Sequence, residues 1–395
     1  MSGMEVNLAV HLPESLRVQL GSFYTPQQLV DRVHEFVGPY LVSQKRSCVV
    51  FDSAGGCGAF MFALKGFDYR IADRDPVACN FLAQHFDQAN IFCTNSLVGV
   101  SRERFRIPSS AFLIMIGNPP YNDTTSEYKS GRKGQNTCDE DLYDRDLGVS
   151  FLKSYNKLGA DVVCVLHPLS WLSKEANFAR LRGFKENYRL VRGELFSSGM
   201  FQGTGLRKFP IVVALYERHR SGMTYNYIRE FQFAVLGSNR KFVLCTFKTT
   251  DGYIAKYPPR TGEPSVSPIG VYYRSFRDLN SIKRNASFLS RQDGNSIVVT
   301  VENLYKYAYL YALRALFDPP DAWLYGNLSP LLDAGALEGR KELYVYYALS
   351  SNGVLRRLGE PVREKIRAHY GISVKHNLDI ELVKRAIKHE LEKLV

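Results

Sequence analysis

Short apolar stretches alternate with longer mixed segments along the first half of the chain. Helical patterns cover 16–43, 58–65 and 76–86. Six apolar stretches have the length and residue types of strands: 48–51, 69–72, 91–93, 112–116, 162–166 and 211–216. Strands that alternate with helices through short connections predict a parallel sheet covered on both faces, and hence an α/β fold.

The alternation stops near 217–222, and the pattern beyond it is different. Short aromatic strands with Pro and Gly turns come first, followed by helical patterns near 302–317, 340–350, 360–370 and 377–395. The last pattern is amphipathic and is predicted to pack on its own domain. We therefore predict an α/β domain over 1–217 and a mixed α+β domain over 218–395.

Composition supports two folded domains. The chain has 395 residues, of which 45% are hydrophobic and 23% charged, enough to bury a full core. No apolar run approaches a membrane span, and the N-terminus lacks the pattern of a secretory signal. Seven scattered cysteines without a C-x-x-C pair argue against a disulfide framework or a zinc site. We predict a reducing cytoplasmic location, no membrane contact and no metal.

Positive charge is concentrated in the second half. The net charge is +12, and residues 218–300 alone hold 13 Lys and Arg against 5 Asp and Glu. A basic surface attracts polyanions and favours nucleic acid, although a merely soluble basic surface is the alternative. The polar segment 122–147 is interpreted as a mobile loop with further basic residues. The candidate DNA contacts are Lys129, Arg132, Lys133, Arg260, Arg274, Arg277, Lys283 and Arg284.

A glycine-rich turn follows the first predicted strand. Asp52 precedes the glycines, and Met61 stands where the dinucleotide fingerprint needs its third glycine. Asp73 ends the next strand about 20 residues on, where a carboxylate can bind ribose hydroxyls. A nucleoside with a positively charged amino acid end suits both carboxylates, and S-adenosylmethionine is such a ligand. The alternative is a structural turn with a surface aspartate.

The tetrapeptide Asn118–Tyr121 ends the strand at 112–116. Its two prolines fix φ and remove two backbone donors, which leaves the Asn118 side-chain oxygen and the Pro119 carbonyl as rigid acceptors. These acceptors suit a planar group with an NH₂, either an exocyclic amine or a primary amide. Tyr121 supplies a ring on which that group can stack. A strand-ending turn with a packed tyrosine is the alternative.

With these motifs in this order, the sequence resembles the DNA adenine-N6 methyltransferases of the gamma arrangement. Residues 22–26 resemble the motif over the methionine end of S-adenosylmethionine, and 52–60 the glycine motif, with departures at 53, 55 and 57. Asn118–Tyr121 matches the catalytic motif without departure. The resemblance covers about residues 20–217, whereas 218–395 matches a target-recognition domain by position and charge only.

The resemblance implies a Rossmann-like methyltransferase domain and assigns roles to particular residues. It implies catalysis by Asn118, Pro119, Pro120 and Tyr121, and stacking of a flipped base between Tyr121 and a second aromatic residue, either Phe201 or Phe196. Asn95 stands where the family usually has Asp. The implied cofactor-binding residues are Tyr24, Thr25, Pro26, Asp52, Ala54, Gly56, Gly58, Asp73, Asn95, Asn118 and Pro119.

The implied reaction is methyl transfer from S-adenosylmethionine to N6 of an adenine flipped out of double-stranded DNA. The enzyme would be solitary or part of a restriction-modification system with a separately encoded endonuclease, in a prokaryotic, phage or plasmid setting. RNA adenine methylation, protein glutamine methylation and a non-enzymatic nucleic-acid-binding module are the alternatives. The long basic C-terminal half counts against the glutamine enzymes, which end soon after the catalytic domain.

Overall fold

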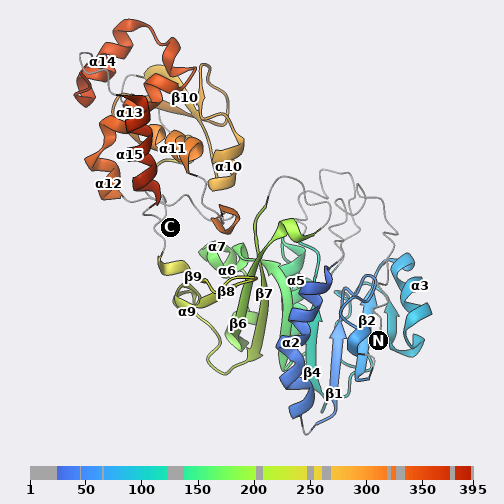
Figure 1. Cartoon of the computed structure of the whole chain (residues 1–395). Coiled ribbons are helices and arrows are strands. Elements are labelled where there is room, and N and C mark those ends of the chain that lie inside the picture. The colour runs from blue at the N-terminus through green and yellow to red at the C-terminus, as the bar shows by residue number, and fades with distance from the viewer. Residues whose placement is uncertain are drawn as a thin grey trace. The chain divides into compact units, whose positions relative to one another are not determined.

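The computed structural model describes residues 25–44, 46–64, 66–121, 138–201, 208–246, 253–259, 268–317, 322–325, 334–373 and 379–392 (Figure 1). The described residues form two compact units, one that ends at Leu244 and one that begins at Cys245. Among the described helices, none combines the length and the apolar character that a membrane crossing requires.

The first unit is built on one nine-stranded sheet with the order β3-β2-β1-β4-β5-β7-β6-β8-β9. β1 to β5 run parallel to one another, whereas β7 is antiparallel to both β5 and β6. The strands are β1 (Cys48–Asp52), β2 (Asp68–Asp73), β3 (Ile91–Cys93), β4 (Phe112–Gly117), β5 (Val162–Pro168), β6 (Tyr188–Ser197), β7 (Pro210–Arg218), β8 (Gln232–Val235) and β9 (Lys241–Val243).

Helices cover both faces of this sheet. On one face, Leu29 and Val33 of α2 (Gln27–Ser43) and Leu82 of α3 (Pro76–His85) share an apolar core with Val213 of β7. On the other face, Phe184 of α8 (Phe184–Asn187) packs edge-on against Tyr216, with ring centroids 5.1 Å apart. The helix α5 (Leu147–Lys157) lies beside α8. The predicted Rossmann-like α/β class is therefore confirmed.

Some predicted elements differ from the structure. The helix predicted over 58–65 is reduced to a 3₁₀ turn at Phe62–Leu64, preceded by turns, because Gly58 adopts a φ of +75° that a helix does not allow. The helix predicted over 16–43 is described from residue 25 onward, and there it forms α2, which begins at Gln27. Of the segment 122–147, interpreted as a loop, residues 122–137 lie outside the described residues. Its end instead holds a 3₁₀ turn, Glu140–Leu142, and the first residue of α5.

The sheet of the first unit continues beyond residue 217. β8 pairs in parallel with β6, and β9 returns antiparallel to β8. The short helix α9 (Tyr225–Glu230) lies between β7 and β8 in sequence. The structural division of the chain therefore falls at Leu244, later than the break in sequence pattern.

The second unit is a mixed α+β structure. Its antiparallel sheet has the order β11-β10-β12, from β10 (Pro268–Arg274), β11 (Phe288–Leu289) and β12 (Ser296–Thr300). Tyr273 of β10 stacks on Tyr307 with ring centroids 4.8 Å apart, which joins the sheet to the helices. The helices include α10 (Leu279–Arg284), α11 (Leu304–Leu316), α12 (Ala334–Gly339), α13 (Lys341–Ser351), α14 (Glu360–Tyr370) and α15 (Ile380–Glu392). Four of them confirm the helices predicted in this half.

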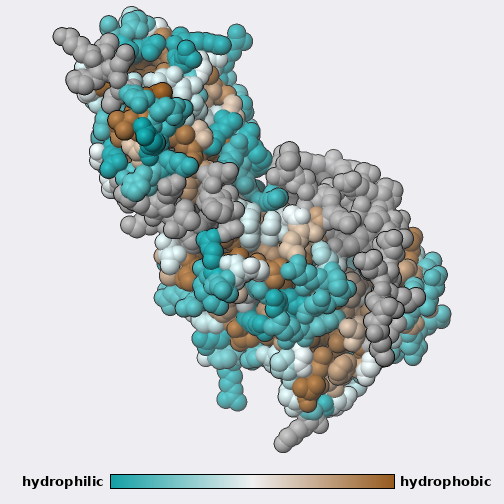
Figure 2. Space-filling model, viewed as in Figure 1, coloured by the Kyte–Doolittle hydropathy of each residue, from teal (hydrophilic) through white to brown (hydrophobic). Residues whose placement is uncertain are grey.

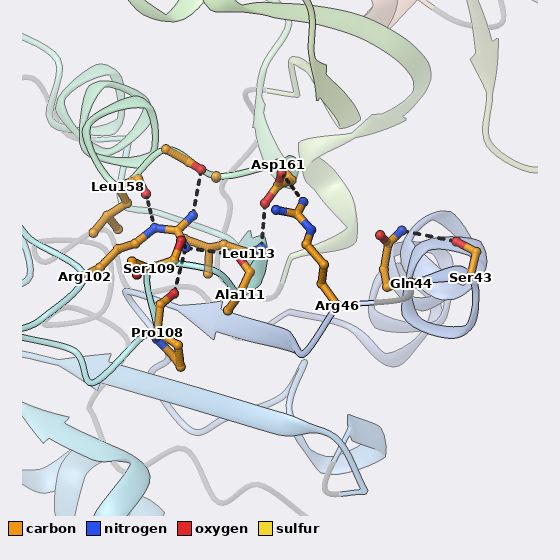
Figure 3. Close-up of polar contacts among 12 residues, drawn as sticks. Ser43, Gln44, Arg46, Arg102, Pro108, Ser109, Ala111, Leu113, Leu158 and Asp161 are labelled. Carbon is orange, nitrogen blue, oxygen red and sulfur yellow. Dashed lines mark hydrogen bonds and ion pairs between the residues drawn. The ribbon is translucent and has the colours of Figure 1, made fainter.

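Arg102 ties together the segments that lead into β4 and β5 (Figure 3). Its guanidinium donates only to backbone carbonyls, and a fork of five N–H donors is suited to this task. The acceptors are Leu158 (2.8 Å), Gly159 (2.9 Å), Pro108 (3.0 Å), Ala111 (3.0 Å) and Ser109 (3.3 Å). Beside it, Asp161 accepts from the Leu113 amide at 2.9 Å and from Arg46 at 2.9 Å.

Replacement of Arg102 by Ala should lower the free energy of unfolding of the first unit by about 3 kcal/mol, because several carbonyls lose a charged donor at once. Urea unfolding would measure it, with Trp171 emission as the reporter and Trp323 replaced by Phe. Arg46→Ala is the matched control, since its half-exposed ion pair should contribute under about 1 kcal/mol. Equal losses in the two variants would contradict this role of Arg102.

Candidate active site

Two of the predicted motifs meet at the carboxyl edge of the sheet. β1 ends at Asp52 and β4 ends at Gly117, and the two strands pair in parallel with Asp52 opposite Ile116. Gly117 leaves room for the carboxylate, since a Cβ at that position would lie 3.0 Å from Asp52 Oδ1. The tetrapeptide Asn118–Tyr121 therefore begins directly beside the Asp52 side chain.

The carboxylate of Asp52 is buried without a counter-charge. Asp52 is 1% exposed, and its Oδ1 accepts a hydrogen bond from the Ala54 amide at 3.1 Å. Burial, opposed in part by that hydrogen bond, raises the pKa of Asp52 to about 7. Within the described part of the chain, no basic side chain forms an ion pair with it. A buried carboxylate of this kind is suited to receive a cationic group from a ligand.

The glycine turn is fixed against the end of β2. The Gly56 amide donates to Asp73 Oδ2 at 2.7 Å, and Gly56 has a φ of +52°, which favours glycine. The other oxygen of Asp73 accepts from the Asp75 amide at 2.8 Å. Burial raises the pKa of Asp73. Because each carboxylate oxygen has more than one lone pair, Asp73 holds the turn and can still accept from ligand hydroxyls.

Asn95 lies just beyond β3 and follows Thr94, which is hydrogen-bonded to Asp73 at the end of β2. The Thr94 amide donates to the Asp73 carbonyl at 2.8 Å. The Asn95 side-chain oxygen accepts from the Leu97 amide at 3.0 Å, so it supports the following turn. Its contact with a ligand stays a prediction.

The amide of Asn118 is bound at both ends. Its Nδ2 donates to Thr25 Oγ1 at 3.3 Å, which joins the segment before α2 to the tetrapeptide. Its Oδ1 accepts from the Tyr121 hydroxyl, which also lies 3.2 Å from the Leu166 carbonyl oxygen. Because Nδ2 of Asn118 donates to Thr25, the acceptor Oδ1 at the other end of the amide points away from Thr25. Pro119 is buried, whereas Pro120 and Tyr121 are partly exposed.

The stretch 166–172 resembles a strand-plus-loop Pro-Ser-Trp-Leu motif of the DNA adenine-N6 methyltransferases, but the contact of its Trp171 with Tyr121 was not predicted from the sequence. The rings of Trp171 and Tyr121 form a T-shaped contact at 86°, with centroids 6.2 Å apart, and Trp171 stacks on His167 at 4.8 Å. His167 is fully buried, and its Nε2 lies 2.7 Å from the Tyr216 hydroxyl. Burial lowers the pKa of His167 to about 4, so this ring stays neutral at physiological pH. The sequence signal was Trp171 itself, one of only two tryptophans.

The other predicted site residues are spread over both units, and some lie outside the described residues. Phe201 is 3% exposed and packs against Phe196, with ring centroids 5.9 Å apart, in the core cluster against which Tyr121 also packs, and its contact with a base stays a prediction. In the second unit, Arg274 pairs with Asp293 at 2.8 Å, and Arg277 with Asp278 at 2.9 Å. Lys283 and Arg284 end α10. Tyr24, Lys129, Arg132, Lys133 and Arg260 are outside the described residues.

Comparisons with known proteins return similarities of fold. No protein-family model and no curated protein match the chain. Among solved structures, the chain is similar to the M protein of the type I restriction enzyme EcoKI, at 12% identity and a TM-score of 0.40, over 96% of this chain and 72% of that one.

Two further solved structures match about half of this chain. One is a type I restriction-modification methyltransferase subunit from Streptococcus thermophilus (15% identity, TM-score 0.37, 58% of this chain and 53% of that chain). The other is the type IIG restriction endonuclease BpuSI (17% identity, TM-score 0.37, 53% of this chain and 26% of that chain). The chain thus spans about half of the first structure and a quarter of the second.

Asp52→Asn should stabilise the protein at alkaline pH. The pKa of Asp52 rises from 3.8 to about 7 on folding, so its stabilising contribution is complete below about pH 4 and is lost as the pH rises through 7. The variant should therefore exceed the wild type by about 4 kcal/mol in free energy of unfolding at about pH 8, and come within about 1 kcal/mol of it near pH 4. Chemical unfolding at both pH values measures this difference.

Asp31→Asn serves as the control, because Asp31 is exposed on α2 and its replacement should change stability little at either pH. A stability difference for Asp52→Asn that is the same at both pH values would contradict the burial of an uncompensated carboxylate.

Proposed function

We propose that the chain is an S-adenosylmethionine-dependent methyltransferase that methylates N6 of an adenine flipped out of double-stranded DNA. The observation that carries the proposal is the adjacency of two unlike sites. The buried carboxylate of Asp52 lies directly beside Gly117, the residue before the acceptors of Asn118 and Pro119. A cation-binding site next to an amine-binding site is what transfer from a sulfonium donor to an NH₂ requires.

The residues around Asp52 fit S-adenosylmethionine. Asp52 is suited to the ammonium group, and Asp73 to the ribose hydroxyls at the end of the second strand. Gly56 and Gly58, both at positive φ, let the backbone approach a ligand closely. Ala54 lies in the same turn, and Thr25 and Pro26 reach the site through Asn118. When bound, the cofactor supplies an electrophilic methyl group on sulfur.

The tetrapeptide is suited to hold the target amine. The Asn118 side-chain oxygen and the Pro119 carbonyl can accept hydrogen bonds from the two N6 protons, and the base can stack on the ring of Tyr121. The Tyr121 hydroxyl must leave Asn118 Oδ1 for this to happen, since that oxygen is bound in the structure. Two such hydrogen bonds draw the nitrogen lone pair out of conjugation with the ring, which makes the amine a nucleophile, and one N6 proton then passes to water. Positioning therefore accounts for most of the rate enhancement. Flipping the base costs a few kcal/mol.

Double-stranded DNA is the proposed partner of the second half. Residues 218–300 carry the strongest excess of positive charge, and the side chain of Arg277 is 66% exposed. Arg284 is also exposed, and hydrophilic residues predominate on the visible described surface of the second unit (Figure 2). Phosphate contacts from such residues fix the register of the duplex. We propose that 218–395, which comprises the last strands of the first unit and the whole second unit, is the target-recognition part, acting with 1–217 as the catalytic part.

One experiment separates the candidate substrates. Incubation of the full chain with labelled S-adenosylmethionine and unmethylated DNA, RNA or protein, followed by nucleoside and amino acid analysis, should give N6-methyladenine in DNA. N6-methyladenine in RNA only, or methylglutamine in protein, would support the alternatives.

Asn118→Ala should lower methyl transfer at least about a hundredfold, because one of the two acceptors for the amine is lost. Binding of S-adenosylmethionine, measured by calorimetry, should change little. Asn80→Ala is the matched control, since Asn80 is exposed on α3. Unaltered turnover in Asn118→Ala would refute the proposed role of the tetrapeptide.

Duplex affinity should fall steeply with salt, because Lys and Arg contacts release counterions from DNA. Replacing Arg277 and Arg284 by Ser should reduce the magnitude of the slope of log affinity against log salt concentration by up to about 2. Fluorescence anisotropy with labelled duplex measures the slope. Arg356→Ser with Arg357→Ser removes the same charge from exposed positions outside 218–300 and should leave the slope nearly unchanged. Equal effects would count against this region as the interface.

A further inference from the structure

Trp171 connects three segments that are distant in sequence. Its indole nitrogen donates to Asp146 Oδ2 at 2.8 Å, and Asp146 caps α5 by accepting from the Gly148 amide at 3.1 Å. The indole is 2% exposed. The indole and the Tyr121 ring form a T-shaped contact, and the indole stacks on His167 at an interplanar angle of 11°. The ring is thus fixed by a hydrogen bond on one side and by stacking on another.

The start of α5 is shaped to receive this ring. A Cβ at Gly148 would lie 2.2 Å from Cη2 of Trp171 and 3.2 Å from the Pro120 carbonyl oxygen. Gly148 therefore allows the indole to fill the space against α5, beside the backbone of the tetrapeptide. Any larger residue at 148 would push Trp171, Pro120 or both out of place.

Tyr121 is held from several directions: by its hydroxyl, by packing against the apolar core cluster and by the ring of Trp171. The hydroxyl contacts Asn118 Oδ1 and the Leu166 carbonyl, and both contacts are open to exchange when an amine arrives. The contact with Trp171 is made by the ring itself. An edge-to-face contact restrains the plane of a ring whether or not its hydroxyl is bonded.

From these contacts we infer that Trp171, oriented by Asp146, is a positioning residue that fixes the plane of the Tyr121 ring on which the target adenine stacks. The inference rests on the proposed function. Trp171 contacts the Tyr121 ring, so it acts on the base through Tyr121. Asp146 and Gly148 act one step further away, by setting the place of the indole.

The test is a double-mutant cycle in the full chain. Trp171→Phe, which keeps a ring and removes the indole N–H, should lower kcat for DNA methylation about five- to tenfold and leave the Kd of S-adenosylmethionine unchanged. In a Tyr121→Leu background, the same substitution should have almost no further effect, because its target ring is gone. Gly148→Ala should give a loss in the same direction, and Trp323→Phe is the matched control.

The outcomes separate this inference from the proposed function. Tyr121→Leu with wild-type methylation would overturn the proposed function itself. An effect of Trp171→Phe that is equal in both backgrounds, or that follows a lowered melting temperature, would assign Trp171 a purely structural role and overturn the inference. So would an unchanged kcat. If transfer by Tyr121→Leu is too slow to measure, 2-aminopurine emission at the methylated position gives the same cycle from binding alone.

Discussion

The parallel pairing of β1 with β4 is the constraint on which the site depends. Each strand is apolar and buried along nearly its whole length, and the register places Asp52 opposite Ile116. Polar groups that follow these strands can only emerge at one edge of the sheet. Asp52 and Asn118 are therefore brought together by hydrophobic burial of residues that take no part in the chemistry.

The described site satisfies its own polar groups. Asn118 is bound by Thr25 and by Tyr121, and Asp73 is bound by two backbone amides. Asp52 is the exception, since it is buried with one amide donor and no cation among the described residues. The free energy that a ligand gains there includes relief of this unfavourable burial, whereas at Asn118 a ligand must replace an existing hydrogen bond.

The sequence predicted the inner strands of the sheet well, because their apolar runs are continuous and are bounded by turn residues. β6 was missed because Arg189, Arg192 and Glu194 interrupt its pattern, although Leu190 and Leu195 between them are buried. α5 was missed because its buried serines give a mixed pattern after a polar segment. Asp52, Asp73 and the tetrapeptide were found through local motifs. The link from Asp146 to Trp171 spans 25 residues and has no local signal.

The reversed direction of β7 has a consequence for how this fold can diversify. Because β7 is antiparallel to β5, with Ile211 opposite Pro168, Ser197 at the end of β6 and Pro210 at the start of β7 lie at the same edge as Asp52 and Asn118. A connection of different length between these two residues would change the surroundings of the site while the ladder of the sheet keeps its register. One inverted strand therefore places beside the site a position where the chain can change without disturbing the sheet.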